Sequence, residues 1–271
     1  MLYHYTTIEA LAMILKTRSI KFSRLDRVDD IEELAESKNI RLGQYMFVSC
    51  WTENSEESIP LWKMYSGNCH GVRIGMEKDM FENYIVRELT LPNGESMKGE
   101  LISKVPASEI VNPNYFILPV SIMPNSKFFY CSVEYVDDVD KMVSETFQLQ
   151  KDDETHSRST MAFGEIGKYK NKRWAFQQET RFRLVILPTN PLLNNSKEAS
   201  SVMMNFILHN KPLSIEEYYL FIRSEVLNNM EITLHPNSSE SDKVIIEALC
   251  EKYAPQAVLK DSSLKGRVLL K

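Results

Sequence analysis

Short strands and short helices alternate through the first 76 residues of this chain, and this alternation restricts the fold more than any other feature of the sequence. The apolar pattern predicts strands at 1–5, 19–23, 46–52 and 71–76, separated by helices at 7–17, 29–39 and 55–65. Elements of this length imply a compact sheet crossed by short helices. We therefore expect an α+β fold.

The opening strand, residues 2–6 (LYHYT), leads at once into the first helix. Thr6 and Glu9 have the spacing of a capping box, so we expect the helix to begin close to Thr6. His4 then lies two residues before a helix N-terminus, where backbone N–H groups suit a phosphate or a ribose hydroxyl. The alternative is a half-buried histidine that hydrogen-bonds a neighbouring backbone group.

The later parts of the chain follow less regular patterns. Residues 84–135 carry several prolines and β-prone runs, which predicts a possible β-rich insertion within a single domain over 1–271. A polar helical segment is expected over 137–160, followed by a strand in the second half of 167–187. Near the C-terminus we expect a strand at 229–236 and a helix at 241–253. That helix would be capped by Ser239 or Ser241 and would bury Val244, Ile245, Leu249 and Tyr253.

Composition excludes several classes of protein. No run of about eighteen apolar residues exists, and Met1 leads directly into a strand without a signal sequence, so we expect a cytoplasmic protein without a membrane segment. The four cysteines form no C-x-x-C pair, which argues against structural zinc and against a disulfide framework. The motifs of serine hydrolases, P-loop proteins, dinucleotide folds and zinc proteases are absent from the sequence.

The net charge of −5 argues against a sequence-independent nucleic-acid coat, but it leaves room for a local basic patch. Basic residues are concentrated in one segment, where they form either a nucleic-acid patch or an ordinary solvated face: Lys168, Lys170, Lys172, Arg173, Arg181 and Arg183.

Two further groups of residues are candidates for a site. Trp62 and Tyr65 lie three residues apart on one short helix and so share a face, either as core residues or as a stacking platform. Gln177 and Glu179 alternate at the start of a strand, with Arg181 in phase, so all three are expected to point to one side. A glutamate at this position can bind a hydroxyl or stabilise a cationic centre; the alternative is a surface ion pair with Arg181 or a lysine.

The order of these motifs resembles a bacterial domain family of unknown function that is often encoded near phage-defence loci. The resemblance is carried by residues 2–6 (LYHYT), 47–51 (FVSCW), 61–65 (LWKMY), 71–75 (GVRIG) and 172–181 (KRWAFQQETR). That family is in turn similar to the His-Tyr-Glu ADP-ribosyltransferases, including DarT-like toxins. This second resemblance implies a split, mostly antiparallel sheet.

The resemblance also implies roles for the candidate residues. His4 and Thr6 would bind the ribose and amide on the nicotinamide side of NAD, and Tyr65 or Trp62 would stack on nicotinamide. Glu179 would be the catalytic residue, and Gln177 and Arg181 would recognise the acceptor. NAD would be the substrate, and no metal would be needed. Asp30 and Glu33 would matter only if they lined the site; otherwise they form an acidic helix face.

On this basis we expect an ADP-ribosyltransferase toxin that modifies a macromolecule, most plausibly RNA or DNA, in a toxin-antitoxin or antiviral-defence system. An antitoxin or a phage-derived trigger would then be a partner. One alternative is a non-catalytic sensor that binds a nucleotide or a phage protein in the same cleft. Another is an NAD glycohydrolase that releases free ADP-ribose.

Overall fold

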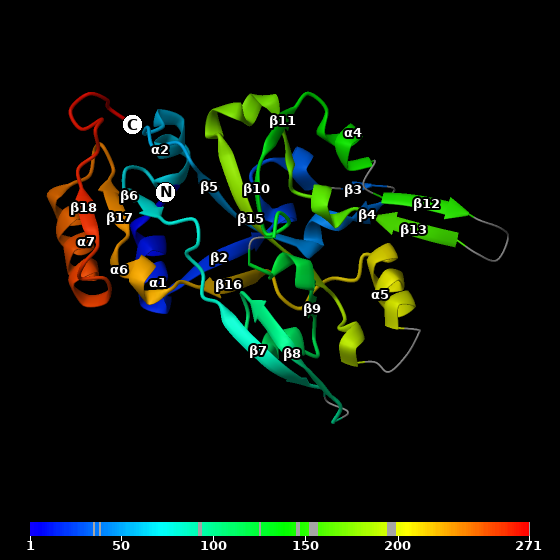
Figure 1. Cartoon of the computed structure of the whole chain (residues 1–271). Helices are drawn as coiled ribbons and strands as arrows, with labels where there is room; N and C mark the ends of the chain where they lie inside the picture. Colours follow the sequence, from blue (N-terminus) through cyan, green and yellow to red (C-terminus); the bar gives the residue numbers. More distant parts are fainter. Residues whose placement is uncertain are drawn as a thin grey trace.

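The computed structural model describes residues 1–34, 36–37, 39–91, 94–124, 126–144, 147–151, 157–193 and 199–270. A ten-stranded sheet lies at the centre of the molecule, and its main path runs β10–β15–β5–β1–β6–β17–β18 (Figure 1). Neighbouring strands on this path are antiparallel except β17 and β18. The path strands are β1 (Leu2–Thr7), β5 (Met46–Thr52), β6 (Gly71–Met76), β10 (Tyr130–Ser132), β15 (Glu179–Leu187), β17 (Glu231–Leu234) and β18 (Val258–Lys260).

The sheet divides into two arms along one edge of β5. The opposite edge of β5 pairs with β15 along its whole length. On the dividing edge, β2 (Ser19–Arg24) pairs with Phe47 and Val48, whereas β1 pairs with Thr52. Beyond these contacts β1 continues to β6, and β2 continues to β16 (Glu217–Phe221). The fold is therefore α+β with a split, mostly antiparallel sheet, as the sequence predicts.

The core is built mainly from side chains of the central sheet and the elements packed against it. Phe81, Phe129 and Phe182 illustrate it, with ring centroids 4.9 to 5.8 Å apart. Helices α1 (Ile8–Thr17) and α7 (Glu240–Tyr253) pack against each other, and α2 (Ile59–Tyr65) contacts β1. The remaining helices are short, except for α5: α3 (Ala107–Ile110), α4 (Val139–Ser144), α5 (Ala199–Leu208) and α6 (Ser224–Asn228).

Small two-stranded sheets surround the main sheet. Two of them are hairpins that project from the body of the molecule (Figure 1): β7 (Tyr84–Thr90) with β8 (Ser96–Ser103), and β12 (Phe147–Lys151) with β13 (Ser157–Met161). The others are β3 (Glu36–Ser37) with β4 (Ile40–Arg41), and β11 (Glu134–Val136) with β14 (Tyr169–Asn171). Within residues 84–135, β9 (Phe116–Ile117) and β10 both pair with β15, so this β-rich region contributes strands to the central sheet.

Several predicted elements differ in the structure. In place of the acidic helix expected over 29–39, the structure has a 3₁₀ turn, η2 (Ile31–Leu34), and then β3; residues 35 and 38 of that prediction lie outside the described residues. The helix expected over 137–160 ends at Ser144 and is followed by the β12–β13 hairpin; residues 145–146 and 152–156 of that prediction lie outside the described residues.

Half of the buried stripe predicted for α7 is confirmed. Leu249 and Tyr253 pack against the core, but Val244 and Ile245 are exposed, and Ile246 is fully buried in their place. The cap is Ser239, which forms a capping box with Asp242. In the part of the chain that is described, no helix has the length and apolar character needed to cross a membrane.

The first helix begins one residue later than predicted. Its cap is Thr7, whose hydroxyl accepts a hydrogen bond from the backbone N–H of Ala10 at 3.2 Å. Thr6 instead lies buried within β1, where it pairs with Val72. Both threonines pair with β6, and Thr7 is the cap because it is the last residue of β1 and its hydroxyl reaches the first turn of the helix.

The cap gives a prediction for stability. Thr7→Val keeps the shape of the side chain but removes the hydroxyl, and we expect it to lower the free energy of unfolding by about 1 kcal/mol. Thr7→Ser keeps the hydroxyl and should stay within about 0.5 kcal/mol of the parent. Urea denaturation measures both variants. Destabilisation by Thr7→Ser but not by Thr7→Val would show that the methyl group matters and the cap does not.

Candidate functional site

A cavity of about 290 Å³ opens where β1 and β2 separate from β5. Small-molecule sites begin at about this volume. The cavity gathers five predicted site residues from four different elements: His4, Tyr65, Gln177, Glu179 and Arg181. The division of the sheet is therefore what brings these distant parts of the chain to one place.

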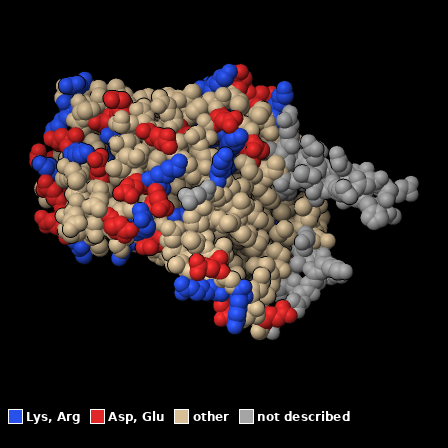
Figure 2. Space-filling model, viewed as in Figure 1, with Lys and Arg blue, Asp and Glu red and all other residues tan. Residues whose placement is uncertain are grey.

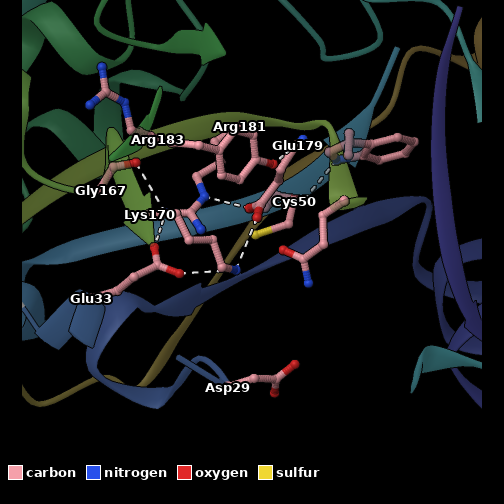
Figure 3. A network of polar contacts seen from close by, with 12 residues as sticks. Asp29, Glu33, Cys50, Gly167, Lys170, Glu179, Arg181 and Arg183 are labelled. Carbon is pink, nitrogen blue, oxygen red and sulfur yellow. Dashed lines mark hydrogen bonds and ion pairs between the residues drawn. The ribbon is translucent and has the colours of Figure 1, made fainter. Parts of the chain in front are cut away.

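Glu179 and Arg181 belong to a buried network of four charges that also contains Glu33 and Lys170 (Figure 3). Arg181 donates through Nε to Glu179 and through Nη1 to Glu33. Its Nη1 also donates to the carbonyl oxygen of Gly167 at 3.1 Å. Lys170 Nζ lies 3.2 Å from Glu179 Oε2 and 3.1 Å from Glu33 Oε1. Two acids and two bases thus balance one another.

This network joins three elements that have no strand pairing with one another. Glu33 comes from η2, Lys170 from β14, and the other two residues from β15. Removing one member of a buried ion pair leaves its partner uncompensated, which typically costs about 3 to 5 kcal/mol. The network therefore fixes both the wall of the cavity and the carboxylate of Glu179.

The network also sets the protonation of Glu179. Burial alone raises the pKa of this carboxyl, but Arg181 and Lys170 outweigh burial and lower the pKa to about 2. The group is therefore a carboxylate at neutral pH. Burial, reinforced by the charge of Glu179, raises the pKa of the Cys50 thiol beside it. Cys50 is thus a neutral thiol and not a nucleophile.

His4 lies in the gap between the two arms of the sheet. Its Nδ1 is 2.7 Å from the carbonyl oxygen of Cys50, in the stretch of β5 between the pairing sites of β1 and β2. Burial lowers the pKa of His4, although the hydrogen bond to Cys50 opposes this shift. Because a carbonyl only accepts, the neutral ring carries its proton on Nδ1, and Nε2 keeps a lone pair. His4 therefore makes the hydrogen bond to a neighbouring backbone that the alternative predicts, and it also lines the cavity.

Tyr65 lines the cavity from the end of α2 and links two of its walls. Its hydroxyl donates to Asp29 Oδ2 at 2.9 Å and accepts a hydrogen bond from Gln177 Nε2 at 3.0 Å. Burial and the charge of Asp29 raise the pKa of Tyr65, so the phenol stays protonated. These two hydrogen bonds orient the Gln177 amide. Its buried Oε1 has no hydrogen-bond partner among the described residues.

Gln177 and Glu179 both face the cavity, as predicted, but not as alternate residues of one strand. Gln177 ends the 3₁₀ turn η6 (Lys172–Gln177), and β15 begins at Glu179. Between them Gln178 has a φ of +43°, in the left-handed region, and its carbonyl accepts a hydrogen bond from the Thr52 hydroxyl at 2.9 Å. This turn directs both side chains to the same side.

Trp62 and Thr6 lie outside the cavity. Trp62 is fully buried: its Nε1 donates to Glu57 at 2.9 Å and its ring packs edge-on against Tyr5 at 4.9 Å. Of the two aromatic residues proposed to stack on nicotinamide, only Tyr65 lines the cavity. Thr6 is a buried residue of β1 and is not part of the cavity lining.

The basic residues between 168 and 183 do not form a basic surface. Lys170, Arg181 and Arg183 are buried, and Lys168 pairs with Glu134 and Glu165. The exposed pair, Lys172 and Arg173, contacts Asp137 at 2.7 Å and Glu32 at 3.7 Å, respectively. On the face drawn in Figure 2, basic and acidic side chains are interspersed. The cluster is therefore divided: Lys170 and Arg181 form buried ion pairs, Arg183 donates to the backbone carbonyls of Gly164 and Ile166, and the exposed members pair with acids at the surface.

Sequence reasoning missed the other members of the site. The sequence predicts Lys170 in a cluster of basic residues, and it predicts Glu33 either at the site or on an acidic helix face. The signal that identifies them is the strand at 181–187 (RFRLVIL), which is apolar apart from two arginines. Arginines on a buried strand require carboxylate partners from elsewhere in the chain. Among the described residues, no three His, Cys, Asp or Glu side chains are grouped so as to hold a metal ion.

A family model described as a protein of unknown function (DUF2971) matches residues 61–182. This span is similar to that family and includes Tyr65, Lys170, Glu179 and Arg181, whereas His4 and Glu33 lie before it. No curated protein and no solved structure matches the chain.

The charge network predicts how stability depends on pH. Glu179 has a folded-state pKa of about 2 and an ordinary value of 4.5. A lowered pKa contributes stability that is fully present above the unfolded value and is lost as pH falls through the folded value. We therefore expect the difference in unfolding free energy between the parent and Glu179→Gln to shrink as the pH falls from about 4.5 towards 2. Denaturant titrations at several pH values measure it; a constant difference would contradict the ion pairing.

Proposed function

We propose that this protein binds NAD in the cavity, cleaves its bond between nicotinamide and ribose, and transfers ADP-ribose to a macromolecule. The register of the sheet at Thr52 is the observation that carries the proposal. Tyr3 on β1 and Glu179 on β15 pair with Thr52 from opposite edges of β5. The strands that carry His4 and Glu179 therefore flank the same end of β5, and both side chains line the cavity although they lie far apart in the sequence.

The side chains of the cavity suit the nicotinamide half of NAD. The ring of Tyr65 offers an aromatic surface, and the neutral His4 ring offers the Nε2 lone pair to an amide N–H or a ribose hydroxyl. Both groups are already held in place, His4 by Cys50 and Tyr65 by Asp29. Preorganised groups of this kind bind without paying for their own ordering.

Glu179 has the charge that the reaction requires. As the bond from ribose C1′ to the nicotinamide nitrogen breaks, nicotinamide leaves with the electron pair as a neutral molecule, and positive charge develops on the ribose. An ionised carboxylate stabilises that charge, and its oxygens retain lone pairs beyond the ion pairs with Lys170 and Arg181. The acceptor then attacks C1′ and loses a proton.

Gln177 is the residue we propose for acceptor recognition. Its buried Oε1 lacks a partner among the described residues, and its Nε2 is held by Tyr65. A buried acceptor of this kind favours a ligand that brings an N–H or O–H group. Arg181, proposed for the same role from the sequence, instead serves to hold Glu179.

We propose nucleic acid, RNA or DNA, as the acceptor class, following the resemblance to DarT-like toxins; protein is the alternative. Aromatic side chains on η6 give this some support, because Trp174 is half-buried, Phe176 is 39% exposed, and η6 ends at Gln177. Nucleic-acid bases stack on exposed aromatic rings. A toxic transferase of this kind needs an antitoxin or a phage-derived trigger as a partner.

A nucleotide-binding sensor is the second candidate. It is favoured by the network itself, because both oxygens of Glu179 are engaged by cations, as they are in a purely structural carboxylate. Hydrolysis of NAD without transfer is the third candidate, and it requires the same residues as transfer does.

Glu179→Gln and Glu33→Gln form a matched pair that tests the proposal. Each removes one acid from the same two cations, but only Glu179 lines the cavity. We expect Glu179→Gln to lose about 100-fold or more of nicotinamide release from NAD. Folded Glu33→Gln should retain activity within about tenfold of the parent. Calorimetric NAD binding and circular dichroism establish that each variant is folded.

The outcomes separate the three candidates. Label from NAD that enters one pool of RNA, DNA or protein, and is lost in Glu179→Gln, supports transfer. Free ADP-ribose released at the same rate with and without acceptor identifies a glycohydrolase. NAD binding without nicotinamide release, unchanged in both variants, identifies a sensor and overturns the proposal.

A further inference from the structure

Two exposed cations in the lining of the cavity, Lys21 and Arg27, have no role in the proposed reaction, and the part of the cavity beside them is called its outer half. Four basic and two acidic side chains line the cavity, in a chain whose formal net charge is −5. Of the basic residues, Lys170 and Arg181 are neutralised by Glu33 and Glu179 within the buried network. The other two are Lys21 on β2 and Arg27 in the 3₁₀ turn η1 (Leu25–Arg27).

We propose that Lys21 and Arg27 form a subsite for a nucleoside diphosphate, namely the ADP half of NAD. The inference rests on the proposed function, because it assigns the rest of the same ligand. The inner half of the cavity, at His4 and Glu179, would hold nicotinamide and its ribose. At about 290 Å³ the cavity lies at the lower limit of small-molecule sites, so the remainder of a dinucleotide must extend past the rim.

Lys21 and Arg27 differ from the inner cations in the partners that hold them. Lys21 pairs with Glu217 at 3.1 Å and Arg27 pairs with Glu216 at 2.9 Å. Neither glutamate lines this cavity, and all four side chains are between 46% and 66% exposed. Exposed pairs of this kind contribute little, so a diphosphate can displace the glutamates and take up both cations.

The surface beside Lys21 suits a nucleoside more than a bare phosphate. Tyr219 is paired with Lys21 across β2 and β16, which places both side chains on one face of the sheet. Tyr219 is 47% exposed, and Phe221, two residues along on the same face, is 51% exposed. An adenine bound next to the diphosphate would have an aromatic ring on which to stack.

Calorimetric titration of the full chain with ADP tests the subsite. We expect Lys21→Gln and Arg27→Gln each to weaken ADP binding about fivefold to tenfold. Glu216→Gln and Glu217→Gln remove the competing acids and should tighten binding about twofold to threefold. Changes of opposite sign at the two ends of each ion pair are the signature of the proposal. Tyr219→Ala should weaken binding of ADP but not of pyrophosphate.

Lys243→Gln is the matched control, because Lys243 is a similarly exposed lysine that faces Glu247 at 3.9 Å on α7. It should leave ADP binding unchanged. Equal affinity of Lys21→Gln, Arg27→Gln and the control for ADP would overturn the subsite. If NAD is cleaved with a KM that these variants do not change, the subsite is wrong and the proposed function stands. If ADP binds as expected but NAD is not cleaved, the subsite stands and the proposed function fails.

Discussion

The ion pairs around Arg181 are the interaction on which the rest of this structure depends. The guanidinium is fully buried near the start of β15, and such a charge is tolerated only where carboxylates compensate it. Glu33 and Glu179 supply that compensation, and Lys170 completes the balance. These contacts hold the 3₁₀ turn η2 and the short strand β14 against β15 of the main sheet. They also keep the carboxyl group of Glu179 ionised where it lines the cavity.

The division of the sheet supplies the second half of the arrangement. Because β1 and β2 leave β5 at different points, part of its edge is free for the His4 ring to enter, and the cavity follows from that gap. Inner and outer parts of the cavity then have different electrostatics. The inner part carries a neutralised network and a neutral histidine, whereas the outer part carries the exposed cations Lys21 and Arg27, which pair with surface glutamates.

Local patterns predicted much of the fold. The strands at 46–52 and 71–76 have the predicted bounds, because each is a short apolar run between polar or turn-forming residues. Predictions failed where a distant partner decides the conformation: Glu33 was placed on a helix face, but it turns inward to meet Arg181. Local motifs predict His4, Tyr65 and Glu179 as candidate site residues, and all three line the cavity. The burial of Trp62 depends on Tyr5 and Glu57, which helical spacing cannot reveal.

A crystal structure with a slowly cleaved carbocyclic analogue of NAD would test the central claim most directly, since that claim concerns where the ligand lies. The account predicts nicotinamide between His4 and Tyr65, and the ring hydroxyl that replaces the ribose 2′-hydroxyl within hydrogen-bonding distance of Glu179. The ion pairs of Glu179 with Lys170 and Arg181 should remain. An analogue bound elsewhere, or a cavity that excludes it at saturating concentration, would contradict the account.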